Sequence, residues 1–254
     1  MENDEINACF DQARQGADVV LVEGTKGLHD GVDVNGKDSN AALAHQLGLP
    51  VVLVLDARGI TRGIAPLLQG TASFDTTIQI AGVILNFVAG ERHEQKLRAA
   101  LSRYTDIPVL GAIRHDPGMV IGERHLGLVT VSEHTYGQAQ VDRMAQLVEQ
   151  VDIPELLRRT VITEIPPRSV VTPSPTQLTA NVRIAIAKDA AFGFYYPDDL
   201  TAFVRAGAEL VPFDTLNDAR LPAVDGLFIG GGFPESFIST LAANQTLQRI
   251  FEIS

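Results

Sequence analysis

Three polar side chains end apolar runs of the sequence in a pattern that could place them in one ligand site. The runs and the residues that end them are 19–22 with Glu23, 51–55 with Asp56 and 78–85 with Asn86. Parallel strands end at a common edge of their sheet, where α/β proteins bind ligands, so we expect the three side chains there. A carboxylate at this edge could hold a metal ion or orient a phosphate. Solvent-facing strand ends are the alternative, since Asp and Asn are also ordinary turn residues.

Basic side chains are grouped at three places in an otherwise acidic chain. The groups are Arg92 with His93, Arg114 with His115, and Arg124 with His125. Arg and protonated His bind carboxylates through charge-assisted hydrogen bonds, so these groups suit a substrate that carries many carboxylates. Solvated surface charges in ordinary salt bridges are the alternative. None of the histidines shows the paired close spacing of a zinc site.

The composition predicts a globular protein with one large or two smaller domains. The 254 residues are 45% hydrophobic, and no apolar run approaches the roughly 18 residues of a membrane span. A formal net charge of -11 argues against nucleic acid or an anionic membrane as a partner. The N-terminal segment is acidic, unlike a targeting leader, and the single cysteine cannot form an internal disulfide, so we expect a cytoplasmic protein. We expect that cysteine, Cys9, to be a buried small apolar residue.

Strands alternate with helices along the chain, which predicts an α/β fold with a parallel sheet covered on both faces. The expected strands are 19–23, 51–55, 78–85, 108–113, 182–187, 208–213 and 226–229. The expected helices are 2–16, 39–47, 60–75, 91–104, 132–151, 197–206 and 236–254. Asp38 is expected to cap the second helix. The glycine-rich, charged segment 24–37 predicts an active-site loop or an exposed loop.

A proline-rich stretch divides the chain. Residues 161–181 contain four prolines with several Ser and Thr and no helical period, which is typical of an extended interdomain linker. We therefore expect one domain at 1–160 and a second α/β unit at 182–254. With only two or three strands, the second unit is expected to be cut short.

Six stretches of the chain together resemble a known enzyme family. They are VEGTKGLHDG, DSNAALAHQLGLPVVLVLDA, GVILNFVAGERHEQKLRAAL, GAIRHDPGMVIGERHLGLV, FGFYYPDDL and GGGFPE. In this order and spacing they are similar to the glutamine-dependent a,c-diamide synthases of cobyrinate and hydrogenobyrinate, which amidate tetrapyrroles. The agreement of six separate motifs makes the resemblance specific, whereas any one of them would be weak.

The resemblance implies a fold and an activity. Residues 1–160 would be an incomplete P-loop domain similar to dethiobiotin synthetase, and residues 182–254 the start of a class I glutamine amidotransferase domain. The implied activity is that of a carbon–nitrogen ligase. ATP with Mg²⁺ converts the a and c carboxylates of cobyrinate into acyl phosphates, and ammonia from glutamine then forms the amides. The implied partners are an anionic tetrapyrrole, ATP and glutamine, and a homodimer is allowed.

The resemblance also assigns roles to individual residues. Glu23 matches the acidic residue that binds Mg²⁺ and nucleotide, and Asp30 matches an aspartate needed for orderly amidation of the substrate. Asn86 matches the position that reads the adenine edge, and Asp56 is expected in the same nucleotide site. The expected substrate-binding residues are Arg114, Arg124 and His125. The expected oxyanion loop is Gly230, Gly231 and Gly232, because glycine lets backbone N–H groups converge on an oxyanion.

Two departures from the family pattern bear on activity. The motif G-x-x-x-x-G-K-[ST] is absent from the sequence, and the family places it before residue 1. The family's nucleophilic cysteine and its His and Glu partners belong after residue 254, and Cys9 cannot replace the nucleophile. We therefore expect an internal fragment that lacks both ends and is inactive alone. A non-catalytic fragment that binds tetrapyrrole or nucleotide is an alternative, as is an amidase of sirohaem or nickel-sirohydrochlorin.

Overall fold

A computed structural model of the chain describes residues 2–119, 123–124, 127–128, 137–162 and 182–245. The chain divides into two compact units, Met1–Val129 with Thr135–Val171 and Thr130–His134 with Thr172–Ser254. Each unit combines helices with a parallel sheet, so the predicted α/β class is confirmed. Most of the expected linker, from residue 163 to 181, lies outside the described residues. The expected domain boundaries therefore stay predictions.

The first unit is built on a three-stranded parallel sheet in the order β1-β2-β3. The strands are β1 (Val51–Asp56), β2 (Ile80–Val88) and β3 (Val109–Arg114), and they are connected by α3 (Ile64–Phe74) and α4 (Glu91–Tyr104). Neighbouring parallel strands need a crossover of this kind, because a short hairpin can join only antiparallel strands. The expected strands 51–55, 78–85 and 108–113 form β1, β2 and β3, and α4 has the expected bounds.

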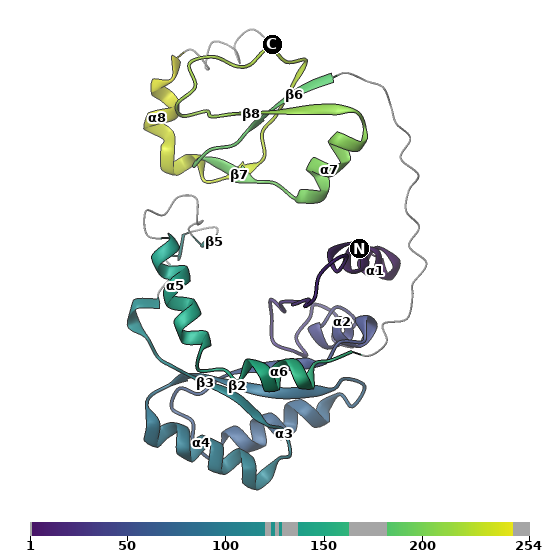
Figure 1. Cartoon of the computed structure of the whole chain (residues 1–254), viewed down its shortest axis with the longest axis vertical. Coiled ribbons are helices and arrows are strands. Elements are labelled where there is room, and N and C mark those ends of the chain that lie inside the picture. Colours follow the sequence, from purple (N-terminus) through teal and green to yellow (C-terminus); the bar gives the residue numbers. More distant parts are fainter. Residues whose placement is uncertain (1, 120–122, 125–126, 129–136, 163–181, 246–254) are drawn as a thin grey trace. The chain divides into compact units, whose positions relative to one another are not determined.

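The core of the first unit lies between this sheet and helices α3 and α4, which Figure 1 shows on one side of the strands. Its fully buried side chains include Ile64, Leu68, Val83, Leu85, Val88, Leu97 and Leu101. Burying each of these stabilises the fold by about 1.5–3 kcal/mol. A slip of one residue in the register of β2 would turn the side chains of Val83 and Leu85 away from the core. Packing therefore fixes which residues meet at the ends of the strands.

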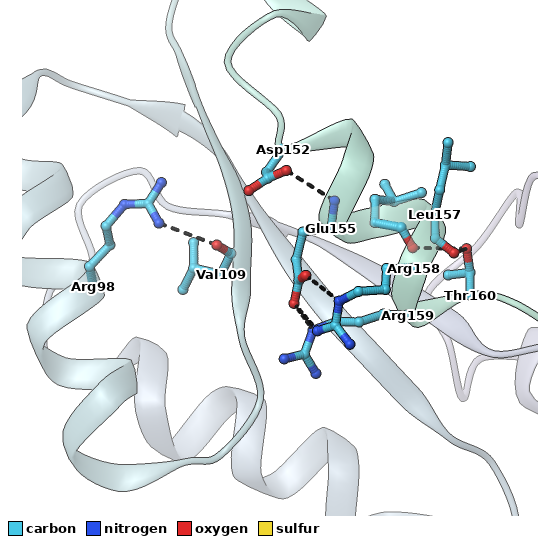
Figure 2. Close-up of polar contacts among 9 residues, drawn as sticks. Arg98, Val109, Asp152, Glu155, Leu157, Arg158, Arg159 and Thr160 are labelled. Carbon is cyan, nitrogen blue, oxygen red and sulfur yellow. Dashed lines mark hydrogen bonds and ion pairs between the residues drawn. The ribbon is translucent and has the colours of Figure 1, made fainter.

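The other side of the sheet is covered by α6 (Ile153–Arg159), which contacts β2 and β3 (Figure 1). The carboxylate of Asp152 begins the helix by accepting a hydrogen bond from the backbone N–H of Glu155 at 3.0 Å (Figure 2). The Glu155 carboxylate accepts further hydrogen bonds from Arg158 and Arg159, which lower the pKa of Glu155 to about 2. Helices therefore cover both faces of the sheet, as the sequence predicts.

The segment from Val19 to Glu23 is not a strand, and that expectation is wrong. Val19 is 63% exposed and Leu21 is 92% exposed, and the segment has no regular secondary structure. Branched apolar residues favour strands only where a neighbouring strand and a packed face receive them. Among the described strands, β1 pairs only with β2, and none pairs with this segment. The apolar run lies at the surface instead.

Helix α1 (Asn3–Ala13) corrects the expectation for the single cysteine. The helix begins at a capping box, in which Glu2 and Glu5 exchange side chain-to-backbone hydrogen bonds. Phe10 is buried, and Cys9 beside it is exposed rather than buried. Successive residues of a helix point in different directions, so the face that buries Phe10 turns the neighbouring thiol toward solvent.

Helix α2 (Asn40–Leu47) is capped by Ser39, whose hydroxyl accepts a backbone hydrogen bond from the first turn at 3.1 Å. Asp38 is therefore not the cap that the sequence predicts. Its carboxylate instead accepts the backbone N–H groups of Val32 and Asp33, at 2.7 and 3.0 Å. These bonds lower the pKa of Asp38 and organise the glycine-rich loop before the helix.

The remaining elements of the first unit follow β3. They are the 3₁₀ turn η1 (Pro117–Met119), the short strands β4 (Glu123–Arg124) and β5 (Gly127–Leu128), and helix α5 (Gly137–Val148). The strands β4 and β5 pair antiparallel. Helix α5 forms within the helical stretch expected at 132–151, of which residues 132–136 lie outside the described part. A bidentate ion pair of Arg143 with Asp116 joins α5 to the segment before η1.

The second unit contains a parallel sheet in the order β8-β6-β9. Its elements are β6 (Val182–Ala187), β7 (Phe192–Phe194), α7 (Pro197–Arg205), β8 (Ala208–Phe213), β9 (Gly226–Phe228), β10 (Gly231–Gly232), η3 (Pro234–Phe237) and α8 (Ile238–Ala243). The three parallel strands and α7 match the predicted ranges closely. The antiparallel pair of β7 with β10 was not predicted. In the parts of the chain that the structure describes, every helix is too short or too polar to cross a bilayer.

Replacing Leu85 with Ala tests the position of the core. Leu85 is fully buried in β2, so the change should lower the free energy of unfolding by about 2–5 kcal/mol. Val54→Ala in β1 is the matched control, because Val54 is 60% exposed and should cost no more than about 1 kcal/mol. Urea unfolding followed by circular dichroism measures both. Equal losses in the two variants would contradict this core.

Candidate functional site

The carboxyl edge of the first sheet brings two of the expected ligand residues together. Asp56 at the end of β1 pairs in register with Asn86 in β2. The backbone N–H of Ala57 donates to the carbonyl of Asn86 at 2.9 Å, which joins the two strand ends directly. Strand β2 continues past Asn86 to Val88, which pairs with Arg114 at the end of β3. Acidic, amide and basic side chains therefore follow one another along a single edge.

Arg58 forms an ion pair with the carboxylate of Asp56. Its Nε lies 2.8 and 3.0 Å from the two carboxylate oxygens, and its Nη2 makes a further bond to the same group. The backbone N–H of Arg58 donates to Asp56 as well, at 2.9 Å. These hydrogen bonds lower the pKa of Asp56 and raise that of Arg58. The negative charge of Asp56 is thus compensated within its own loop, which weakens the case for this residue as a nucleotide ligand.

Phe87 carries backbone strain at the same edge. Its φ angle is 56°, in the left-handed region that costs a residue other than glycine about 1–3 kcal/mol. The guanidinium carbon of Arg58 lies over the Phe87 ring, 4.5 Å from the ring centroid. The ring centroids of Phe87 and His115 are 5.7 Å apart. The side-chain oxygen of Asn86 accepts the N–H of Phe87 at 3.0 Å. That bond uses one of two oxygen lone pairs, so Asn86 can still accept a ligand donor.

His93 joins two loops of this edge rather than facing a substrate. Its Nε2 lies 2.6 Å from the carbonyl of Ile60, and its Nδ1 accepts the N–H of Ala89 at 3.1 Å. A carbonyl oxygen can only accept, so Nε2 is the donor in the bond to Ile60. His93 lies in the first turn of α4, within the helix expected at 91–104. Its role in this structure is to connect the loops that follow β1 and β2.

Glu23 and Asp30 lie in the segment before α2, and both are exposed. Glu23 does not end a paired strand, so the expected edge of three strand tips is wrong for this residue. Asp30 closes a turn, in which its N–H donates to the carbonyl of Gly27 at 3.1 Å. The fold nevertheless holds this segment near the core, because His29 bonds the carbonyl of Thr71 in α3 at 2.9 Å.

The expected Mg²⁺ site can be tested against these carboxylates. Among the described residues, no three His, Cys, Asp or Glu side chains are grouped to hold a metal ion. Mg²⁺ commonly takes one or two protein carboxylates and completes its shell with phosphate oxygens and water. The exposed carboxylate of Glu23 fits such a shared site. Asp56 fits less well, because Arg58 already bonds both of its oxygens.

The three expected substrate-binding residues fall on different parts of the chain. Arg114 is exposed at the end of β3, and its backbone N–H donates to the Gln150 side chain at 3.2 Å. Arg124 lies in β4, but its side chain is not described, and His125 lies outside the described residues. The structure therefore places only Arg114 at the carboxyl edge of the sheet. The roles of Arg124 and His125 stay predictions.

The expected oxyanion loop belongs to the second unit. Gly231 and Gly232 form β10 and pair with Phe194 and Phe192 of β7. Gly230 precedes them, and its N–H donates to the hydroxyl of Tyr195 at 3.1 Å. Sequence reasoning missed Tyr195, although it lies in the quoted stretch FGFYYPDDL. Two adjacent tyrosines gave no signal for which of them faces the glycine turn.

Two family models match the chain. One, described as an AAA domain, matches residues 1–120, and the other, a CobB/CobQ-like glutamine amidotransferase domain, matches residues 183–252. The proteins named cobyrinate a,c-diamide synthase from Magnetococcus marinus, Methanosarcina acetivorans and Salmonella typhimurium are 44%, 39% and 37% identical over 93%, 96% and 95% of this chain. The chain belongs to the cobyrinate a,c-diamide synthase family. It spans about half the length of these curated relatives, namely 52%, 51% and 53%. No solved structure matches it.

In this member of the cobyrinate a,c-diamide synthase family, replacing Arg58 with Ala should raise the pKa of Asp56 toward the ordinary value. The side-chain and backbone donors of Arg58 keep that pKa low. A carboxyl-detected NMR titration of Asp56 measures the change. The depressed pKa means that the pair stabilises the fold above the ordinary carboxylate pKa and that this contribution disappears as pH falls through the folded value.

Arg62→Ala is the matched control for this titration. Arg62 lies over the ring of Tyr104, 5.2 Å from its centroid, so its loss should leave the titration of Asp56 unchanged. An Asp56 pKa that is the same in Arg58→Ala and in the unmodified chain would contradict the described pairing.

Proposed function

We propose that this chain is part of an enzyme that amidates the a and c side-chain carboxylates of a cobyrinate-type tetrapyrrole, with ATP and glutamine. ATP supplies the phosphoryl group that turns each carboxylate into an acyl phosphate, and glutamine supplies the ammonia that displaces the phosphate. This is the chemistry of a carbon–nitrogen ligase in cobalamin biosynthesis. The single cysteine suits a reducing compartment, and we propose the cytoplasm. A homodimer stays a prediction.

One observation carries this proposal. The same chain joins an AAA-domain match and a CobB/CobQ-like glutamine amidotransferase match, in that order. The relatives that match more than nine-tenths of this chain are named cobyrinate a,c-diamide synthase. Neither unit alone would favour this substrate, since each domain type supports many reactions.

The first unit supplies residues suited to the synthetase half of the reaction. Arg114, at the end of β3, is an exposed cation that can bind a substrate carboxylate. Asn86 presents a side-chain amide, with a donor and an acceptor, which suits the edge of adenine. Glu23 would supply a carboxylate ligand to Mg²⁺, and Asp30 is proposed to order the two amidations. The pairing of Asp56 with Arg58 favours a role in shaping this edge over direct nucleotide contact.

The second unit supplies the glycine turn for the glutaminase half. Acyl transfer from glutamine creates an oxyanion, and backbone N–H groups fixed before the reaction stabilise it. Gly230, Gly231 and Gly232 have no side chains that would obstruct the approach of the amide group. Support comes from the close packing of this turn against β7, where an added Cβ at Gly231 would lie 3.2 Å from the Cβ of Phe194.

A hybrid enzyme tests the proposal. The half of the Magnetococcus marinus synthase that matches this chain would be replaced by residues 1–254, with the rest of that enzyme kept. The hybrid should convert cobyrinate to its diamide only when ATP, Mg²⁺ and glutamine are all present, as measured by mass spectrometry. Glu23→Gln in the hybrid should lower the rate by roughly 10-fold or more, because one carboxylate ligand of the metal is lost.

Two outcomes would contradict the proposed substrate. The hybrid could amidate sirohaem or nickel-sirohydrochlorin and leave cobyrinate unchanged, which would assign the chain to another tetrapyrrole. It could also fold and hydrolyse ATP without amidating any tetrapyrrole, which would favour a binding role for this chain. Asp33→Asn is the control for Glu23→Gln, because this half-buried carboxylate of the same loop accepts its hydrogen bonds from the nearby Asn35.

A further inference from the structure

The hydroxyl of Tyr195 connects two backbone groups of the second unit. It donates a hydrogen bond to the carbonyl of Ala187, at the end of β6, at 2.5 Å. It also accepts the N–H of Gly230 at 3.1 Å. A phenol has one proton and two lone pairs, so both bonds can form at once. The central strand of the sheet and the start of the glycine turn are therefore held through one oxygen atom.

The ring of Tyr195 fits closely against the same glycine. A Cβ added at Gly230 would lie 2.5 Å from Cε1 of Tyr195 and 2.7 Å from the carbonyl oxygen of Phe194. Real side chains do not approach this closely, so only glycine allows the turn to lie on the ring. The ring of Tyr195 also packs against that of Phe228, with the ring centroids 5.5 Å apart. Burial of the phenol raises the pKa of Tyr195. A phenol is protonated at neutral pH in any case, so the hydroxyl can donate.

The far end of the turn is held separately. The N–H of Phe233 donates to the carbonyl of Ala191 at 2.9 Å. Phe233 is only 2% exposed, and its ring meets that of Phe194 edge-on with centroids 5.1 Å apart. Asp189 fixes this acceptor strand by accepting the N–H groups of Ala191 and Phe192 at 2.8 and 2.9 Å. The residues between the two anchors are Gly231 and Gly232.

We propose that Tyr195 is a positioning residue that fixes the glycine turn by holding the N–H of Gly230. This N–H and that of Phe233 are both engaged within the protein. Gly230 therefore cannot offer its N–H to an acyl oxygen while it is bonded to Tyr195. This second statement rests on the proposed glutaminase role, whereas the positioning by Tyr195 does not.

Tyr195→Phe tests the proposal, because it removes the hydroxyl and keeps the ring. In the ¹⁵N-labelled chain, amide hydrogen exchange at Gly230 should become roughly 3- to 10-fold faster, as expected for the loss of one hydrogen bond. Exchange at Ala185 in the centre of β6 should stay unchanged, which separates a local effect from general destabilisation. Tyr196→Phe is the matched control, since the neighbouring side chain is 78% exposed.

A second measurement needs no variant. In the unmodified chain, the ring protons of Tyr195 should show a nuclear Overhauser effect to the amide proton of Gly230. Absence of this signal would overturn the proposal, even if Tyr195→Phe failed to fold. Unchanged exchange at Gly230 in folded Tyr195→Phe, or equal acceleration in Tyr196→Phe, would overturn it too. None of these readouts needs glutamine hydrolysis, so an inactive hybrid enzyme would leave this result intact and would count only against the proposed function.

Discussion

Parallel pairing of β1, β2 and β3 is the constraint on which the first unit depends. The buried side chains of β2 fix the strand register, and that register sets Asp56 beside Asn86 and Val88 beside Arg114. Crossover helices are required by the parallel arrangement and return the chain so that every strand ends at the same edge. Chemistry at this edge is therefore a consequence of packing below it. The strain at Phe87 is tolerated because the surrounding strand pairing holds the backbone in place.

The second unit follows the same logic on a smaller scale. Strand β6 of its parallel sheet ends at Ala187. The hydroxyl of Tyr195 bonds both this strand end and the N–H of Gly230, and so fixes Gly230 relative to the sheet. The glycine turn is thus placed by side-chain hydrogen bonding in addition to sheet pairing. In both units the groups that could bind a ligand are backbone groups or short polar side chains. Bulky neighbours such as Phe87 and Tyr195 set the geometry of these groups.

Sequence periodicity predicted the elements that pack against a core. It failed where a neighbouring strand or a hydrogen-bonding side chain decides the structure. Helix 91–104 and strand 182–187 were predicted with the observed bounds, because their apolar spacing reports burial directly. The run at 19–22 has the same apolar character, but a strand also needs a paired neighbour, which a linear pattern does not reveal. The bonding of Asp56 to Arg58 and of Tyr195 to Gly230 depends on the directions of the side chains. Neither interaction could therefore be predicted from composition and spacing. The family resemblance located the glycine turn without the tyrosine that holds it.

The central proposal is that the carboxyl edge of the first sheet, where Arg114 lies exposed, binds a carboxylate of the tetrapyrrole substrate. A titration of the ¹⁵N-labelled chain with cobyrinate, followed by amide chemical shifts, tests it most directly. Saturable shifts are expected at Arg58, Phe87 and Arg114, with none at Val51 and Val109, which lie at the opposite ends of their strands. Shifts confined to Val51 and Val109, or none at either edge at millimolar cobyrinate, would contradict it.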